Sequence, residues 1–205
     1  MPPSPKFYLA SRSPRRAELL RQLAVPFDVL LLREASGRDR DVLEESLDAE
    51  PPAHYVERMA RTKAQVGHDR MQNRNLAALP VLGADTEVVL ANAVFGKPRD
   101  DDDAVEMLTR LVGRTHDVMT AVALKLADRT EFEVSVSRVT MRKLSREEIV
   151  RYVATGESRD KAGGYAIQGL AAAFITRLEG SYSGVMGLPL AECAALLARA
   201  GMRVL

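Results

Sequence analysis

Three arginines crowd the start of an expected helix near the amino terminus. They occupy positions 12, 15 and 16 of the segment Ala10-Ser11-Arg12-Ser13-Pro14-Arg15-Arg16. The start of a helix already carries a partial positive charge and unpaired N–H groups, so acidic residues are usual there. Three cations at this place favour a bound anion, and a phosphate suits a strand followed by a serine-rich turn and a helix. The alternative is that the arginines point into solvent and bind nothing.

A carboxylate interrupts an otherwise apolar segment at Asp85. The segment from Val81 to Leu90 is typical of a strand, and its alternation places Asp85 and Glu87 on one face together with Gly83. A carboxylate in this setting can hold a divalent cation or take a proton from water. Asp85 is the better candidate of the two acids, since we expect Gly83 to leave space for a ligand. The alternative places both acids on a solvated sheet face.

Two lysines and a glycine-rich segment can complete a set of groups that handles phosphates. Lys63 falls within the apolar stripe of its helix, where a lysine either extends along its stem into solvent or points into a cleft. Lys97 lies between Gly96 and Pro98, and taken alone it is a turn lysine. The segment from Asp160 to Gly169 fits neither a Walker loop nor a dinucleotide fingerprint. Its Tyr165 and Gln168 can stack on a base and hydrogen-bond to it, or the segment can simply join two elements.

The elements that must position these groups alternate early in the chain. We expect strands over 7–10, 27–32 and 81–90, with the second one buried, and paired strands over 118–126 and 132–141. Helices are expected from Ser13-Pro14 to near residue 26, over 54–74, from the aspartates at 100–103 to Gly113, from the capping box of Ser145 and Glu148, and over 190–200. Residues 33–52 are expected to form a loop. This order favours an α/β fold with a mixed sheet.

Composition restricts the class of protein. The 205 residues carry 29 Lys+Arg against 28 Asp+Glu, so the broad basic field of a non-specific nucleic-acid binder is missing. No apolar run approaches the ~20 residues that cross a bilayer, and the amino terminus lacks a secretory signal. One cysteine favours a reducing compartment. We therefore expect a cytoplasmic enzyme or regulator with no membrane or nucleic-acid partner.

Several other signals carry less weight. The aspartates at 100–103 stand at an expected helix start, where they complement the helix dipole. This is a simpler interpretation than a metal site. His68-Asp69 and His116-Asp117 spell the dipeptide of metal phosphohydrolases, but such sites need further ligands, and His54 is the one other histidine. Cys193 lies in an Ala-Leu-rich helix and is expected to be a small core residue.

Taken together, these segments resemble the Maf family of nucleoside triphosphate pyrophosphatases. The resemblance spans nearly the whole chain in the family's order. Its matching pieces are residues 10–20, 60–64 around Lys63, Gly83-Ala84-Asp85-Thr86, Gly96-Lys97-Pro98, 113–122, 160–169 and 180–190. It implies a single domain over 1–205 with an elongated mixed sheet and flanking helices, a Maf/ITPase-like fold with two lobes around a nucleotide cleft. It also implies a homodimer.

The resemblance further implies hydrolysis between the α- and β-phosphates, with a divalent cation (Mg, Mn or Co) as cofactor. The 160–169 segment is similar to the branch that acts on dTTP and UTP. By match, Asp85 is the proton acceptor and Arg15, Thr86 and Gln168 fall at specificity positions. The other matched positions of the cleft are Ser11, Lys63, Lys97, Asp160 and Lys161, and Arg12 joins the lysines in gathering the triphosphate. Asp85 is the expected metal ligand, with Glu34 as the nearest counterpart of a second acid.

One departure from the family concerns the base. The usual order Gly-Ala-Tyr-Gly reads Gly163-Gly164-Tyr165-Ala166 here, which shifts where the backbone can take unusual dihedral angles. Two alternatives to the pyrimidine enzyme therefore stay open. One is a nucleotide-binding regulator of septum formation with little turnover, and the other is a pyrophosphatase that prefers purine or methylated nucleotides.

Overall fold

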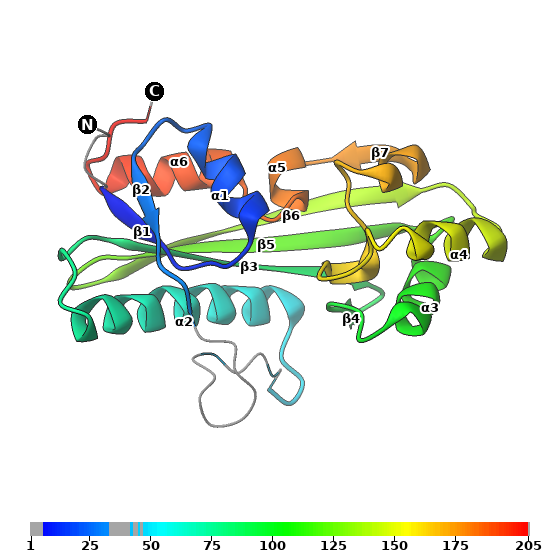
Figure 1. Ribbon diagram of the computed structural model, residues 1–205, viewed down its shortest axis with the longest axis horizontal. Coiled ribbons are helices and arrows are strands. Elements are labelled where there is room, and N and C mark those ends of the chain that lie inside the picture. Colours follow the sequence, from blue (N-terminus) through cyan, green and yellow to red (C-terminus); the bar gives the residue numbers. More distant parts are fainter. Residues whose placement is uncertain (1–5, 33–41, 43–44, 46, 205) are drawn as a thin grey trace. The chain divides into compact units, whose positions relative to one another are not determined.

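A computed structural model describes residues 6–32, 42, 45 and 47–204. Helices and strands alternate over residues 7–90 (Figure 1). In chain order the elements are β1 (Phe7–Leu9), α1 (Pro14–Arg21), β2 (Phe27–Val29), α2 (Pro52–Asn73), β3 (Val81–Leu90), β4 (Ala93–Phe95), α3 (Asp101–Leu111), β5 (Thr115–Lys125), β6 (Thr130–Met141), α4 (Arg146–Ala154), the 3-10 helices η1 (Ala162–Gly164) and η2 (Leu170–Phe174), β7 (Ile175–Glu179), α5 (Tyr182–Val185) and α6 (Leu190–Arg199).

Within the described part of the chain, seven strands form one sheet in the order β2-β1-β3-β5-β6-β7, with β4 paired to β3. β1 runs parallel to β2 and β3, whereas the pairs β3–β4 and β6–β7 are antiparallel. The predictions of a mixed sheet and of flanking helices are therefore confirmed. No described helix is both long enough and apolar enough to span a membrane.

The described strands and helices separate into two compact units. Unit 1 comprises Met1–Asp85, Thr120–Val134 and Gly187–Leu205, and unit 2 comprises Thr86–Met119 and Ser135–Met186. Strands β3, β5 and β6 each contribute residues to both units.

In unit 1, helix α1 begins as its sequence predicts. Ser13 is the cap, its hydroxyl accepts a hydrogen bond from the Arg16 N–H, and Pro14 follows at the first helical position. No acid stands in the first turn. The helix buries Leu19 and Leu20. The following strand β2 differs from expectation, because it ends at Val29 and leaves Val29 44% exposed. Its place at one end of the strand order explains this exposure.

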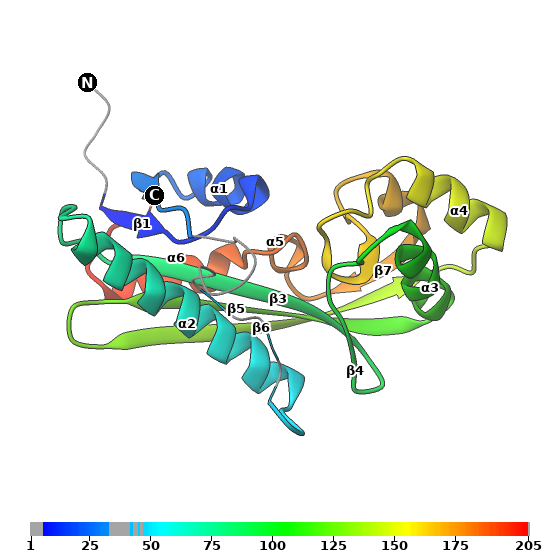
Figure 2. The same ribbon diagram turned by 60° about the horizontal axis from the view of Figure 1, so that its bottom comes forward.

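Helix α2 runs alongside β3 in unit 1 (Figures 1 and 2). Two glycines permit this close approach. A Cβ added at Gly83 would lie 2.5 Å from the Ala60 carbonyl oxygen and 2.6 Å from the Ala64 nitrogen, and one at Gly67 would lie 2.8 Å from Cγ1 of Val81 in β3. The backbones of the helix and the strand therefore touch at Gly83, with no room for any side chain.

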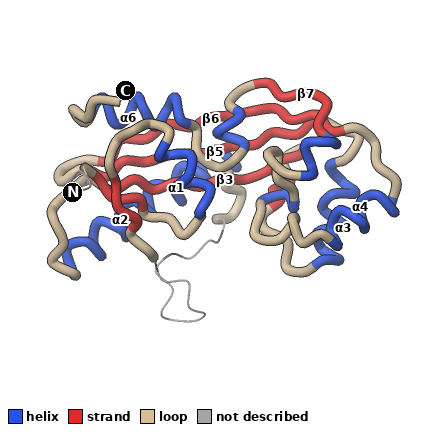
Figure 3. Tube along the Cα trace, turned by 45° about the horizontal axis from the view of Figure 1, so that its top comes forward, coloured by secondary structure: helices blue, strands red, loops and turns tan. Residues whose placement is uncertain are grey.

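Unit 2 is built around its own apolar core, to which Val88, Leu108, Val139 and Tyr152 contribute. Helices α3 and α4 lie side by side over it (Figure 3). Both helices begin as expected. Asp100 caps α3 by accepting from the Asp103 N–H, and Ser145 caps α4 with Glu148 in a reciprocal capping box.

A buried histidine belongs to the core of unit 2. His116 on β5 is 2% exposed, and its Nε2 lies 2.8 Å from the Tyr165 hydroxyl. Because burial disfavours the imidazolium, the pKa of His116 falls to about 4. Between pH 6.5 and 4, His116 is therefore protonated in the unfolded chain but neutral in the folded chain.

Replacement of Gly83 by alanine tests the contact between α2 and β3. We expect Gly83→Ala to lower the free energy of unfolding by about 3 kcal/mol, because the methyl group meets backbone atoms that cannot move aside. Gly96→Ala is the control, since a Cβ there meets nothing within 4 Å, and its effect should stay below about 1 kcal/mol. Urea denaturation measures both. Equal effects of the two substitutions would contradict the close contact.

Acid should destabilise the wild-type chain through His116. The contribution of His116 to the free energy of unfolding is largest above pH 6.5. It falls by about 3 kcal/mol as the pH decreases from 6.5 toward 4. His116→Gln removes the titrating ring while keeping a polar partner for Tyr165. Urea denaturation between pH 7 and 4 should therefore show a shallower loss of stability in the variant than in the wild type. Identical pH profiles would contradict this account.

Candidate active site

The turn before α1 is held by its serines. The buried Ser11 hydroxyl accepts from the Ser13 N–H at 3.1 Å, and the Ala10 N–H donates to the Leu82 carbonyl oxygen of β3 at 2.8 Å. Ser11, expected to contact substrate, thus also shapes the backbone of the arginine-bearing turn. The second of these bonds fixes the turn beside the part of β3 that leads to Asp85.

The three arginines of this turn have different surroundings. Arg16 donates through Nε to the Gly187 carbonyl oxygen at 2.8 Å and through Nη1 to the Ala84 carbonyl oxygen at 2.9 Å. The Arg12 side chain is exposed and its Nη1 reaches the Leu32 carbonyl oxygen at 3.4 Å, while Arg15 is half-buried. Arg16 therefore links the start of α1 to the peptide just before Asp85. The sequence pattern grouped Arg16 with Arg12 and Arg15 as a cation for a bound anion, and it gave no sign of these bonds, because the two carbonyl groups are remote along the chain.

The carboxylate of Asp85 faces α2. Its Oδ1 accepts a hydrogen bond from Lys63 Nζ at 2.6 Å, and the side chains of the pair are 9% and 13% exposed. The Lys63 side chain therefore points inward to Asp85 and does not extend into solvent. A buried carboxylate needs such a partner, since an isolated ion inside a protein is costly.

The expectation that Gly83 leaves open space was wrong. The backbone of α2 fills the position where its side chain would stand, as the distances to Ala60 and Ala64 show. The same approach has a second effect on the site. Lys63 precedes Ala64 on the helix, and Asp85 follows Gly83 by two residues on the same face of the strand. The glycine therefore brings the lysine to the carboxylate instead of leaving room for a ligand.

Asp85 keeps one oxygen without a hydrogen-bond partner in the described residues. This atom, Oδ2, is buried. The same residues contain no group of three or more His, Cys, Asp or Glu side chains that could hold a metal ion. Magnesium commonly takes one or two carboxylates and completes its shell with substrate phosphates and water. Asp85 Oδ2 fits that kind of donor set, whereas the predicted second ligand, Glu34, lies outside the described residues.

The remaining predicted site residues belong to unit 2. Thr86 is half-buried on β3, and Lys97 is exposed just after β4. Asp160 is exposed at a positive φ of 58°, and Lys161 donates through Nζ to the Arg159 carbonyl oxygen at 3.1 Å. Gln168 is exposed in a turn.

The segment around Lys97 and the glycine-rich segment meet within unit 2. The Gly163 N–H donates to the Gly96 carbonyl oxygen at 3.0 Å. Gly163 and Gly164 both have positive φ, at 68° and 69°, where a side chain would be strained. The turn of Lys97 therefore lies against the segment that carries Lys161 and Gln168.

Of the two possibilities left open for Tyr165, the structure does not favour stacking on a base. Tyr165 is 6% exposed, its ring packs edge-on against His116, and its hydroxyl is the partner of the His116 imidazole. Burial also raises the pKa of Tyr165. This aromatic side chain is a core residue that anchors the glycine-rich segment.

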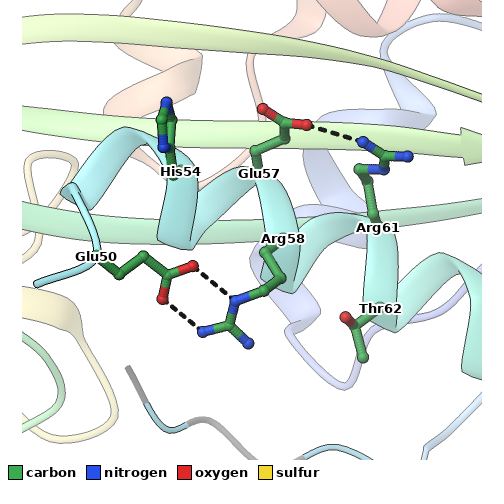
Figure 4. A pocket seen from close by; sticks show the side chains of 6 residues that line it. All are labelled: Glu50, His54, Glu57, Arg58, Arg61 and Thr62. Carbon is green, nitrogen blue, oxygen red and sulfur yellow. Dashed lines mark hydrogen bonds and ion pairs between the residues drawn. The ribbon is translucent and has the colours of Figure 1, made fainter. Parts of the chain in front are cut away.

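A separate hollow lies at the start of α2 (Figure 4). It is lined by Glu50, His54, Glu57, Arg58, Arg61 and Thr62. Figure 4 shows its acids and arginines turned toward one another, with Glu50 binding Arg58 through both oxygens at 2.7 and 2.6 Å. This partner lowers the pKa of Glu50 to about 2. None of the predicted site residues lines this hollow.

Comparison with known proteins identifies a family. The family model described as Maf-like protein matches residues 6–200. A dTTP/UTP pyrophosphatase of Nitrosospira multiformis is 52% identical over 199 residues, covering 97% of this chain and 96% of that protein. A dTTP/UTP pyrophosphatase of Aromatoleum aromaticum is 53% identical, covering 94% of each chain, and one of Dechloromonas aromatica is 47% identical, covering 98% and 100%.

One solved structure shows a distant likeness. The Staphylococcus aureus Ham1 protein aligns over 94% of this chain and 96% of its own, with a TM-score of 0.46 and 11% sequence identity.

Proposed function

The chain belongs to the Maf-like protein family, and we propose that it hydrolyses dTTP and UTP to the nucleoside monophosphate and pyrophosphate. The relatives named as dTTP/UTP pyrophosphatases support the choice of substrate, since they are about half identical to this chain over nearly their full lengths. The observation that carries the chemistry is the buried pair of Lys63 and Asp85, with its Oδ1–Nζ distance of 2.6 Å.

Cationic side chains of unit 1 are proposed to hold the triphosphate. Arg12 and Arg15 stand in the turn that opens α1, where the helix adds its own partial positive charge and no acid competes. Phosphate oxygens repel an incoming nucleophile, and neighbouring cations lower that repulsion. Lys63 adds a further positive charge beside Asp85. Arg16 acts differently, because its guanidinium binds the carbonyl groups of Gly187 and Ala84 and so keeps β3 against the turn.

Asp85 is proposed to take the proton of the attacking water. Lys63 holds Oδ1, which leaves Oδ2 to accept that proton as water attacks the α-phosphorus. The bond between the α-phosphorus and its bridging oxygen then breaks, and pyrophosphate leaves. The oxygen atom of the attacking water ends on the nucleoside monophosphate.

A divalent cation is proposed to bind with the substrate, held by Asp85 and phosphate oxygens. Its chemistry there is to neutralise charge on the phosphates and to lower the pKa of water.

Further residues are proposed to contact the nucleotide on the strength of the family resemblance. Lys97, Asp160 and Lys161 match positions of the family's cleft, and Arg15, Thr86 and Gln168 match its specificity positions. The burial of Tyr165 leaves Gln168 as the exposed polar side chain of that segment with the best means of reading a base edge. We also propose a cytoplasmic homodimer, in line with the single cysteine and the family resemblance.

A substrate panel tests this function. The protein is supplied with dTTP, UTP, dCTP, CTP, ATP and GTP, each with Mg²⁺, Mn²⁺ or Co²⁺ in H₂¹⁸O, and mass spectrometry identifies the products. We expect dTTP and UTP to be hydrolysed fastest, with ¹⁸O in the monophosphate and none in pyrophosphate. Faster hydrolysis of purine nucleotides would contradict the choice of base, and binding without turnover would indicate a sensor instead of an enzyme.

Two variants separate chemistry from binding in this assay. Asp85→Asn should lower kcat at least ~10³-fold while the Kd for dTTP changes less than about threefold, because the amide keeps the shape but cannot accept the proton. Asp128→Asn is the control, since Asp128 is exposed in the turn between β5 and β6. It should keep wild-type turnover. Pyrophosphate release at a near-wild-type rate from Asp85→Asn would contradict the assigned role.

A further inference from the structure

The turn that presents Gln168 is a short reversal within unit 2. The Gly169 N–H donates to the Ala166 carbonyl oxygen at 3.0 Å, so Ile167 and Gln168 are its two central residues. Ile167 is 7% exposed, whereas Gln168 is exposed. Ile167 anchors the turn to the protein interior, and Gln168 faces outward.

The first end of this turn is tied to helix α4. The Ala166 N–H donates to the Tyr152 hydroxyl at 3.3 Å. Tyr152 is 4% exposed, and its ring packs edge-on against Phe174 at a centroid distance of 5.3 Å. Burial, followed by the hydrogen bond to Glu157, raises the pKa of Tyr152, so the hydroxyl keeps its proton.

The second end is tied to Glu157, which follows α4. The Leu170 N–H donates to Oε2 at 2.8 Å and the Ala171 N–H donates to Oε1 at 3.1 Å. The Tyr152 hydroxyl donates to Oε1 at 2.9 Å. The tyrosine and the glutamate therefore form one network that fastens the chain on both sides of Gln168.

Gly169 makes room for this carboxylate. A Cβ added at Gly169 would lie 2.2 Å from Glu157 Oε2 and 2.5 Å from its carboxyl carbon. The carboxylate cannot move aside without losing three hydrogen bonds, all of which it accepts. A glutamine in place of Glu157 would turn its N–H₂ group toward one of these three donors, and that hydrogen bond would be lost.

We propose that Tyr152 and Glu157 are positioning residues that set the base selectivity of this enzyme by fixing the turn of Gln168. The inference rests on the proposed function, in which Gln168 reads the base. Neither residue touches the substrate in this account. Both act through the backbone from Ala166 to Ala171, so their effect on selectivity requires the Gln168 side chain.

The test compares Glu157→Gln and Tyr152→Phe with Gln168→Ala and with the double variants that combine each with Gln168→Ala. The measured quantity is the ratio of kcat/KM for dTTP to kcat/KM for dCTP, two substrates that differ in their base. Each of the two positioning variants should lower this ratio about tenfold, as expected for the loss of one oriented hydrogen bond. In the Gln168→Ala background they should change it less than about twofold. Glu147→Gln, at an exposed acid of α4, should keep the wild-type ratio.

Hydrogen exchange gives a readout that needs no substrate. The amides of Leu170 and Ala171 should exchange faster in Glu157→Gln, and that of Ala166 should do so in Tyr152→Phe, while amides of β5 keep their wild-type rates. If both kinetic ratios fall by the same factor with and without Gln168, or do not fall at all, the positioning role is overturned. Absence of dTTP hydrolysis by the wild type would instead overturn the proposed function, and the selectivity role with it, whatever the exchange rates show.

Discussion

The contact between helix α2 and strand β3 at Gly83 is the constraint on which the site in unit 1 depends. Backbone atoms of Ala60 and Ala64 occupy the space where any other residue would place its Cβ. Because helix and strand meet this closely, the ammonium group of Lys63 reaches the carboxylate of Asp85, and both groups can be buried. The packing of the unit and the chemistry of its central acid therefore have one origin.

Two further contacts hold β3 to the rest of unit 1. The backbone bond from Ala10 to Leu82 and the bonds of Arg16 to Ala84 and Gly187 bring the serine- and arginine-bearing turn to the residues that precede Asp85. Unit 2 differs, because its predicted site residues include exposed polar side chains on a glycine-rich segment. The buried pair of His116 and Tyr165 and the network of buried Tyr152 with half-buried Glu157 hold this segment in place.

Local signals in the sequence predicted most elements well. The bounds of β3, the cap of α1 at Ser13 and the capping box at Ser145 depend on residues near one another in the chain, and the structure has all three. Contacts between segments that are remote along the chain were not predicted. Periodicity placed Gly83 on the face of Asp85 but could not show that α2 covers it. The sequence showed that Tyr165 lies in a glycine-rich segment. It could not show that this tyrosine is buried beside His116. Nothing local distinguished Arg16 from its two neighbours.

The coupling between Lys63 and Asp85 tests the central claim most directly. Urea denaturation gives the free energy of unfolding for the wild type, Lys63→Met, Asp85→Asn and the double variant. The account predicts that Lys63→Met alone costs about 3 kcal/mol, because it leaves a buried carboxylate without its cation, and that adding Asp85→Asn restores most of that loss. If the costs of the two substitutions simply add, the pair is not coupled, and the packing at Gly83 does not set the state of the acid.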